Sequence, residues 1–259
     1  MSEHAIEFDE ERHKYSIDGV EMKCSVTELI HHFFPAFDSE SAAKLTLAGR
    51  KREQYRSILQ DVDPTSQEAR DLVKAEWKRG CDEAAVAGTG MHKSIEEYYD
   101  TGKKPDPMTK EFSMFEAFDK HTRQLGYVPL ASEKTVFDLS MSLAGSVDML
   151  YIRKSDIDSK PIRVWMVDWK RSKEIKTQGF RDERGYPPFN GLQNCNLQHY
   201  TGQLNLYKFL LEKNHGFIIE RMTLVILHPN QPEYLAIDVA DIQETLKAGL
   251  RIKFPELDF

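Results

Sequence analysis

The stretch Val164-Trp165-Met166-Val167-Asp168-Trp169-Lys170 is the one around which the rest of the chain is organised. Four apolar residues run into an acid, a tryptophan and a lysine, which predicts a buried β-strand ending in polar groups. Because side chains alternate between the two faces of a strand, Asp168 and Lys170 must point the same way and Trp169 the other way. The sequence therefore predicts a carboxylate and an ammonium side by side at a strand end. An ordinary ion pair at the edge of a sheet would give the same pattern.

A second acid, Asp148, lies in the apolar run 143–152 just upstream. The polar segment 153–160 connects this run to the strand at 164–170, so we expect an antiparallel hairpin with a long loop. The two acids would then meet on adjacent strands.

The composition indicates a globular protein. The chain has 259 residues, of which 40% are hydrophobic and 30% charged, enough for one sizeable core, and two full domains are not required. It has no run of about 18 apolar residues, and residues 1–10 lack a basic stretch leading into an apolar one. We therefore expect neither a membrane span nor a secretory signal, and place the protein inside a cell without choosing among cytoplasm, nucleus and organelle.

Cysteine spacing and net charge exclude some classes of site and leave others open. Cys24, Cys81 and Cys195 share no C-x-x-C spacing, which argues against a zinc ribbon, an iron–sulfur cluster or a disulfide framework. A net charge of −7 gives no global attraction to nucleic acid, although a basic groove can exist on an acidic protein.

The N-terminal third is expected to hold a small hairpin followed by helices. Two alternating runs, 6–8 and 14–17, precede the turn Asp18-Gly19 and predict the hairpin. Ser25-Val26-Thr27-Glu28 matches a capping box, which starts a helix that should end before Pro35.

Helix-forming residues dominate from 39 to 100, and two breaks are expected there, at Asp63-Pro64 and at Gly88-Thr89-Gly90. After the second break, His92 and Glu96 lie four apart on one helical face. A structural histidine packed against apolar neighbours would explain this pattern, and so would an imidazole that ligates a metal. Hydrophobic periodicity predicts helices at 110–125, 197–213 and 239–252, and strands at 131–138, 222–227 and 234–237.

The segment 171–196, directly after the D-x-K, is rich in cations, aromatic rings, glycines and prolines. Such a segment is often a solvated loop. It would also suit a flap that holds a nucleic-acid strand, because phosphates need cations and unpaired bases stack on aromatic rings.

Four motifs, taken in order, resemble the RecB-type branch of the PD-(D/E)XK nuclease superfamily. They are Gly88-Thr89-Gly90-Met91-His92 with Glu96, Gly145-Ser146-Val147-Asp148, Asp168-Trp169-Lys170, and Gln203-Leu204-Asn205-Leu206-Tyr207. They span residues 88–207. The stretch from Phe8 to Thr27 is also similar to relatives such as phage exonucleases and the mitochondrial genome maintenance exonuclease.

This resemblance implies a restriction-endonuclease-like α/β (α+β) fold, with a mixed central β-sheet flanked by helices and a helical N-terminal region. Residues 1–259 would form a single nuclease domain. Within it, residues 1–87 would be a hairpin and helical extension, and residues 88–259 the catalytic core.

The resemblance also implies roles for individual residues. Asp148, Asp168 and Lys170 would be catalytic, with Lys170 positioning or activating the attacking water. The metal ligands would be His92, Asp148, Asp168 and the backbone carbonyl of Trp169. Gln203 and Tyr207 would support the site and the nucleic acid, and Glu133 would act through a water. Independently of the resemblance, the basic composition of the segment 171–196 predicts that Arg171, Lys173, Lys176 and Arg181 bind substrate. Because these ligands are mostly oxygen, Mg²⁺ or Mn²⁺ fits better than zinc. Some relatives carry an iron–sulfur cluster on four cysteines, which this chain lacks, so no such cluster is expected.

Taken together, the sequence predicts a divalent-metal-dependent deoxyribonuclease that hydrolyses phosphodiester bonds. An exonuclease acting on DNA ends or single strands, in replication, recombination or repair, is favoured over a sequence-specific endonuclease because no helix-turn-helix or zinc-finger pattern is present. The expected partner is DNA and not a membrane, and the oligomeric state is not predicted. The alternatives are a non-catalytic nucleic-acid-binding module that retains the fold, an endonuclease, and a metalloenzyme acting on another phosphate ester.

Overall fold

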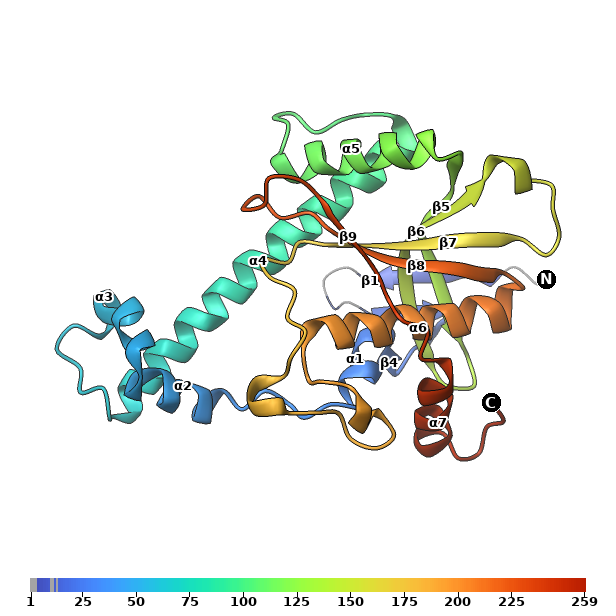
Figure 1. The fold of residues 1–259 in the computed structure, drawn as a ribbon. Helices are drawn as coiled ribbons and strands as arrows, with labels where there is room; N and C mark the ends of the chain where they lie inside the picture. The colour runs from blue at the N-terminus through green and yellow to red at the C-terminus, as the bar shows by residue number, and fades with distance from the viewer. Residues whose placement is uncertain (1–3, 10–11, 13) are drawn as a thin grey trace. The chain divides into compact units, whose positions relative to one another are not determined.

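The computed structural model describes residues 4–9, 12 and 14–259. The fold is α+β, with a mixed central β-sheet flanked by helices (Figure 1), as the sequence predicts. The chain forms two compact units, one made of residues 1–35 and 91–259 and the other of residues 36–90. The expected division into an extension and a catalytic core stays a prediction. Of residues 1–10, used above to argue against a secretory signal, 1–3 and 10 lie outside the described residues.

The central sheet of the first unit has six strands. They are β4 (Cys24–Ser25), β5 (Tyr127–Asp138), β6 (Leu143–Arg153), β7 (Arg163–Lys170), β8 (Ile218–Ile226) and β9 (Leu235–Asp238). Strand β6 runs antiparallel to both β5 and β7, β7 is parallel to β8, and β8 is antiparallel to β9. The hairpin expected between residues 143–152 and 164–170 is therefore confirmed.

One edge of β6 changes partner along its length. Strand β5 pairs with β6 from Leu143 to Arg153, whereas β4 pairs only with Leu143 and Ala144, and β7 only with residues 149–151. Since β5 occupies one edge throughout, β4 and β7 must share the other edge. Residues 145–148 belong to neither of these two ladders in the described part of the chain, so a gap in the pairing opens beside Asp148.

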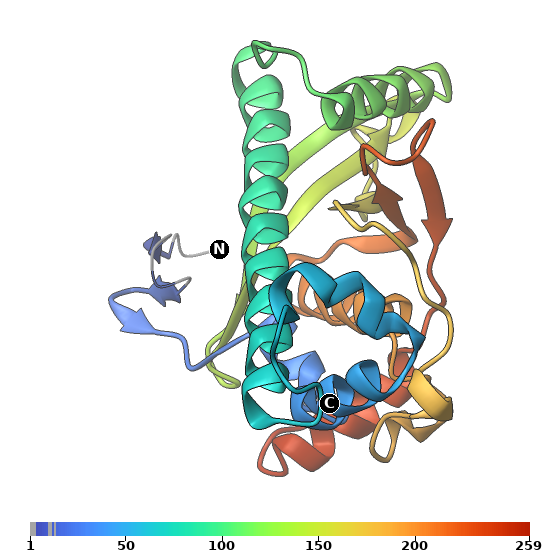
Figure 2. The same cartoon turned by 90° about the vertical axis from the view of Figure 1, so that its left-hand side faces the viewer.

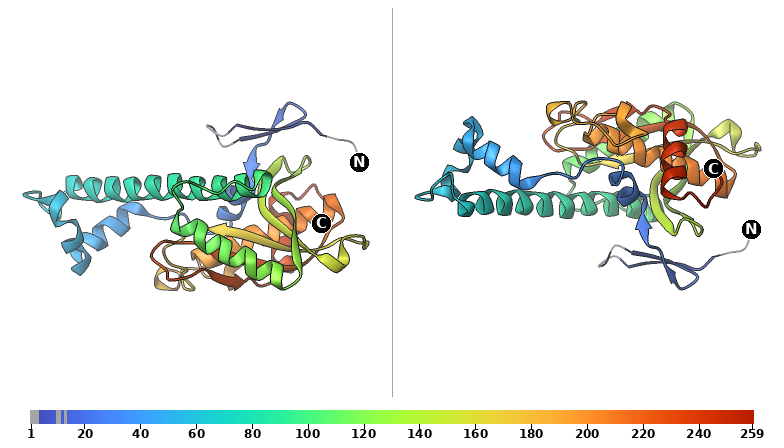
Figure 3. Two further views of the ribbon diagram at one scale, coloured as in Figure 1. Left: turned by 90° about the horizontal axis from the view of Figure 1, so that it is seen from above. Right: turned by 90° about the horizontal axis from the view of Figure 1, so that it is seen from below.

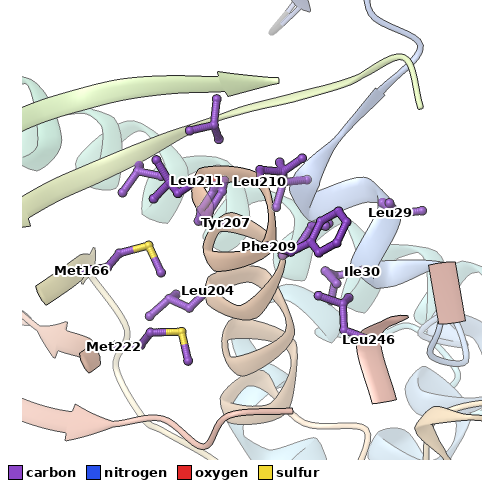
Figure 4. Close-up of a cluster of buried hydrophobic side chains, with 14 of the residues drawn as sticks. Leu29, Ile30, Met166, Leu204, Tyr207, Phe209, Leu210, Leu211, Met222 and Leu246 are labelled. Carbon is purple, nitrogen blue, oxygen red and sulfur yellow. The ribbon is translucent and has the colours of Figure 1, made fainter. Parts of the chain in front are cut away.

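Helices cover both faces of the sheet. They are α1 (Val26–His31), α5 (Lys110–Gln124), α6 (Asn196–His215) and α7 (Gln243–Lys253), with the C-terminal part of α4 (Gln67–Thr101). Alternate residues of β7 enter different cores: Met166 packs in the cluster that contains α1, α6 and α7 residues (Figure 4), and Trp165 in the cluster that contains α5 residues. The period-2 pattern thus places one helical layer on each face.

Local signals explain where the helices of this unit begin and end. The side chain of Ser25 accepts a hydrogen bond from the Glu28 N–H while Glu28 accepts one from the Ser25 N–H, which is the predicted capping box. Thr109 caps α5 through the Phe112 N–H, and α6 ends at His215, followed by the C-cap Gly216, whose φ of +66° suits glycine.

The predicted N-terminal hairpin is also present. Strands β1 (Ile6–Asp9), β2 (Lys14–Ile17) and β3 (Val20–Glu21) form a separate antiparallel sheet, seen as the dark blue strands in Figure 3. Its buried residues Tyr15 and Ile17 pack with Ala144 of β6, which attaches the small sheet to the first unit.

The second unit has a small helical core. It contains α2 (Ser39–Ala48), η1 (Arg50–Tyr55), α3 (Arg56–Leu59) and the N-terminal part of α4. Asp38 caps α2 through the Ser41 N–H, and the core consists of Ala43, Leu47, Leu59, Ala69 and Val73.

The break expected at Gly88-Thr89-Gly90 is wrong, because α4 runs unbroken from Gln67 to Thr101 (Figure 2). Each glycine costs about 1 kcal/mol relative to alanine in a helix. The helical residues on either side outweigh that cost, and ion pairs one turn apart, such as those of Arg79 with Glu76 and Glu83, support the exposed middle of the helix.

Two further expectations concern cysteines and membranes. All three cysteines are free thiols. Among the described residues, no helix combines the length and the apolar character needed to traverse a bilayer.

The imidazole of His199 on α6 makes the stability of the fold depend on pH. Its Nε2 lies 2.8 Å from Asn194 Oδ1, and its ring lies 4.3 Å from the Phe34 ring and 5.1 Å from the His31 ring, between centroids. Burial, together with the His31 imidazole, lowers the pKa of His199 to about 4. The unfolded chain, with a histidine pKa of about 6.5, therefore binds more protons than the folded chain between these two values.

We expect the free energy of unfolding to fall as the pH drops from about 6.5 towards 4, because protonation of His199 favours the unfolded chain. Urea unfolding at pH 7 and pH 5 measures this. His199→Gln keeps a donor for Asn194 but cannot titrate, so its loss of stability between the two pH values should be smaller. An identical loss in both proteins would assign the pH dependence to other groups.

Candidate metal centre

Three residues far apart in the sequence bring ligand atoms together. His92 comes from α4, Glu133 from β5 and Asp148 from β6, and their ligand atoms all lie within 4.8 Å of one another. His92 Nδ1 is 3.6 Å from Glu133 Oε1 and 3.6 Å from Asp148 Oδ2. The Asp148 side chain is 9% exposed, and the side chains of His92 and Glu133 are about three times more accessible to solvent.

Strand register explains how the carboxylates meet. The β5–β6 pairs Ser132↔Met149 and Lys134↔Val147 flank the position at which Glu133 faces Asp148. The β6–β7 ladder stops at the next residue, where Asp168 would face Asp148. Three acids therefore occupy neighbouring positions on β5, β6 and β7.

The strands are distorted at this point. Glu133 has a φ of +42°, a conformation that non-glycine residues rarely adopt. Val147 packs in the core with α6, whereas Met149, two residues on, packs in the core with α5. Residues two apart in a regular strand share a face. The side chains of β6 therefore switch from one face of the sheet to the other at Asp148. A backbone strained in this way is common where side chains must converge on a site.

A hydrogen bond fixes Asp148 where β7 leaves β6. The Trp169 N–H donates to Asp148 Oδ2 at 2.7 Å, and the carboxylate thus takes the place of a backbone carbonyl at the end of the ladder. The Trp169 side chain is buried on the other face, against α5 residues. Its carbonyl as a metal ligand stays a prediction.

Asp168 and Lys170 lie side by side, as the alternation of β7 predicts. Lys170 Nζ is 2.8 Å from Asp168 Oδ2 and 5.0 Å from the centre of the Tyr200 ring. Both side chains are largely buried, at 18% and 3% exposed. Asp168 is outside the three-residue ligand cluster, so its role as a ligand also stays a prediction.

Helix α6 supplies a second wall. The Gln203 side-chain amide nitrogen Nε2 donates to Tyr207 Oη at 3.2 Å and to Thr27 Oγ1 of α1 at 3.3 Å, so Gln203 and Tyr207 lie in contact. Their role in nucleic-acid binding stays a prediction. Tyr207 also lies against Gly145 of β6: a Cβ atom there would come within 2.9 Å of the tyrosine ring. This close approach requires glycine at position 145.

The electrostatics of the cluster follow from burial and proximity. Burial and the neighbouring Asp168 and Glu133 charges, opposed by His92, raise the pKa of Asp148 to about 7. Burial disfavours the charged imidazole of His92, but Asp148 and Glu133 outweigh it and raise the pKa of His92 to about 9. Burial likewise opposes charge on Glu133, yet the nearby His92 imidazole and the hydrogen bond from Ser146 hold its pKa below the usual value. Such a concentration of shifted pKa values is typical of functional sites.

The basic residues predicted to bind substrate differ in their exposure and in whether they form an ion pair. Arg171 forms an ion pair with Glu111 of α5, with Nε 2.8 Å from Oε1, and both side chains are less than one-fifth exposed. Lys173, Lys176 and Arg181 are exposed on the segment after β7. None of these four is brought into the ligand cluster.

Sequence reasoning gave no role to three residues of the site. Ser146 Oγ donates to Glu133 Oε2 at 2.8 Å, Tyr200 lies under the Lys170 ammonium, and Thr27 accepts from Gln203. Signals for two were present: Ser146 is two residues before Asp148 in the same strand, and Tyr200 is two helical turns before Tyr207. Thr27 is 176 residues from its partner, so no local pattern could identify it.

The residues fit a divalent cation. The donor set is one imidazole nitrogen and several carboxylate oxygens, which suits Mg²⁺ or Mn²⁺ and contains none of the thiolates of structural zinc sites. The buried Oδ2 of Asp168 faces the Lys170 ammonium at 2.8 Å and has no other polar partner among the described residues. A buried oxygen of this kind is a suitable acceptor for a water held by the cation.

Comparisons with known proteins identify no family. No family model matches the chain, and no curated protein matches it. A solved structure described as "Crystal structure of SSO0001" aligns with 90% of this chain and 76% of its own length, at 12% sequence identity and a TM-score of 0.32. A likeness at this level carries no argument about fold or function.

Proposed function

We propose that this protein is a divalent-metal-dependent nuclease that hydrolyses DNA phosphodiester bonds. It belongs, in this proposal, to the RecB-type branch of the PD-(D/E)XK superfamily, and it acts as an exonuclease on DNA ends or single strands. The observation that carries the proposal is the convergence of His92, Glu133 and Asp148 beside the Asp168–Lys170 pair. These groups come from one helix and three strands.

The chemistry of phosphodiester hydrolysis needs what these residues offer. His92, Glu133 and Asp148 would hold Mg²⁺ or Mn²⁺, which polarises a phosphoryl oxygen and makes a coordinated water more acidic. The positively charged ammonium of Lys170 would lie where negative charge develops on the phosphate, and it can also orient the attacking water. Asp168 holds the Lys170 ammonium at 2.8 Å, and the Tyr200 ring limits its movement on another side.

Each group plays a separate part in this arrangement. The Ser146 hydroxyl fixes one oxygen of Glu133 and leaves the other facing His92. The Trp169 N–H fixes Asp148. The supporting hydrogen bonds orient ligands before any cation binds, and second partners of this kind are common around metal sites. A binding module that had lost catalysis would not need the complete set.

The test is incubation of the purified protein with end-labelled DNA, single-stranded and double-stranded, linear and circular, with Mg²⁺, Mn²⁺ or EDTA. We expect shortening of linear DNA with either metal, none with EDTA, and resistance of the circles. Cleaved circles would instead establish an endonuclease. Intact DNA under every condition, from a protein shown to be folded, would contradict the proposal.

A further inference from the structure

The segment 171–195, which follows Lys170 directly, is an ordered loop. Its backbone is held by hydrogen bonds from the Gly185 N–H to the Leu192 carbonyl at 3.0 Å and from the Asn194 N–H to the Glu183 carbonyl at 2.7 Å. Gly179 fits because a Cβ atom there would lie 2.2 Å from the Glu183 carbonyl oxygen.

A buried aromatic residue anchors the loop to the first unit. Phe189 is fully buried and stacks on Phe33 with ring centroids 4.4 Å apart and planes 8° from parallel. The Tyr186 N–H donates to the Phe33 carbonyl at 2.8 Å. The Tyr186 backbone and the Phe189 ring therefore fix the loop to Phe33.

Two aromatic rings of this fixed loop face solvent. Phe180 is 69% exposed and Tyr186 is 53% exposed. Single exposed apolar residues are ordinary. Next to Phe180, Arg181 and Asp182 have φ values of +54° and +61°, a backbone conformation that non-glycine residues rarely adopt. The Arg181 guanidinium lies 5.2 Å from the centre of the Phe180 ring.

Cations without acidic partners lie on the same loop. Arg171 and Arg184 are paired with Glu111 and Asp182. Lys173, Lys176 and Arg181 are exposed and form no ion pair with the residues that the structure describes. The loop has five basic residues and three acidic ones, Glu174, Asp182 and Glu183, so it carries a net positive charge within a chain of net charge −7.

Rings and free cations together match one kind of partner. Unpaired bases present a π-face that stacks on aromatic side chains, while their phosphates need cations, and duplex DNA hides those faces inside its stack. We infer that the 171–195 loop binds unpaired nucleotides, with bases stacked on Phe180 and Tyr186 and phosphates facing Lys173, Lys176 and Arg181. The loop thereby selects single strands over duplexes. This inference rests on the proposed function, because it names the strand class delivered to the site beside Lys170.

Binding is measured by fluorescence anisotropy in EDTA, which prevents cleavage, with a labelled single-stranded DNA and an equally long strand of abasic residues. Stacking on an aromatic side chain contributes about 1–3 kcal/mol per base, or roughly a 5-fold to 100-fold change in Kd. Phe180→Ala should weaken binding of the normal strand within this range. It should leave binding of the abasic strand unchanged, since that strand has no bases to stack.

Conservative variants separate stacking from simple hydrophobic contact. Phe180→Trp should bind as the wild type does, whereas Phe180→Leu should bind as weakly as Phe180→Ala. Tyr186→Ala tests the second ring in the same way. Ile157→Ala removes an apolar side chain that is 51% exposed, close to the value for Tyr186, from another loop and is the matched control, with no expected change.

The outcomes distinguish this inference from the proposed function. If the wild type cleaves DNA and Phe180→Ala and Tyr186→Ala bind both strands as the wild type does, the inference is overturned and the nuclease stands. If the wild type never cleaves but base-dependent binding is lost in Phe180→Ala, the loop still binds unpaired nucleotides and the nuclease proposal fails. Equal weakening on normal and abasic strands would show that the ring does not stack on bases, and would also overturn the inference.

Discussion

Lys170→Met is expected to reduce the rate of DNA cleavage by about a thousandfold, within the range typical of positioned acid–base and electrostatic groups. The substitution keeps most of the aliphatic stem and removes the cation that lies 2.8 Å from Asp168 Oδ2. The ligand cluster of His92, Glu133 and Asp148 does not include Lys170, so binding of Mn²⁺ should persist. Cleavage is measured on end-labelled linear DNA, and Mn²⁺ binding by calorimetry.

The variant also leaves the Asp168 carboxylate, 3% exposed, without its partner, which costs stability. Lys170→Arg separates loss of catalysis from loss of stability, because it keeps the charge near Asp168 but cannot place one ammonium in the same position. It should fold normally and still cleave far more slowly than the wild type. Lys154→Met, at an exposed position in another loop, is the control. Cleavage by Lys170→Met within tenfold of the wild type would refute the role given to this lysine.

Phe118→Ala is expected to lower the free energy of unfolding by about 3–5 kcal/mol. Phe118 is 3% exposed and its ring meets four others edge-on or tilted, those of Tyr151, Trp165, Trp169 and Tyr234. These rings belong to different strands and to the segment before β9, so they cannot close the cavity without moving the sheet. The loss is a large share of the stability of a typical domain.

Urea unfolding followed by circular dichroism measures this loss. Leu125→Ala, at the exposed end of the same helix, should change the free energy of unfolding by less than about 0.5 kcal/mol. The prediction does not depend on the proposed function. A loss below about 1 kcal/mol for Phe118→Ala would mean that the core beneath Trp169 is loosely packed.

The sequence was most informative where a pattern is local. Alternation along β7 was enough to place Asp168 beside Lys170, and the two apolar runs around residues 153–160 were enough to predict the β6–β7 hairpin. The capping box at Ser25 worked for the same reason, since both hydrogen bonds join residues three apart. In each case the residues that interact belong to the pattern itself or to two runs that flank one loop.

Other features depend on contacts that no short pattern records. Glu133 was expected near the start of a strand, but β5 begins six residues earlier, and the positive φ of Glu133 arises at a distortion shared with β6. Arg171, whose role in substrate binding stays a prediction, pairs with Glu111, sixty residues away, a contact that no local pattern records. The glycines at 88–90 were given too much weight because their cost is small beside the cooperativity of a long helix.

The hydrogen bond from the Trp169 N–H to Asp148 orients one carboxylate of the candidate metal centre as the chain folds. One carboxylate both closes a strand ladder and faces His92, so its orientation is decided when the chain folds and not when an ion arrives. If the proposed cation binds here, little side-chain freedom is left for it to remove, and more of its attraction to these oxygens remains available as affinity. Under the same proposal, removing the cation should leave the side chains in place, so that a cation can bind again.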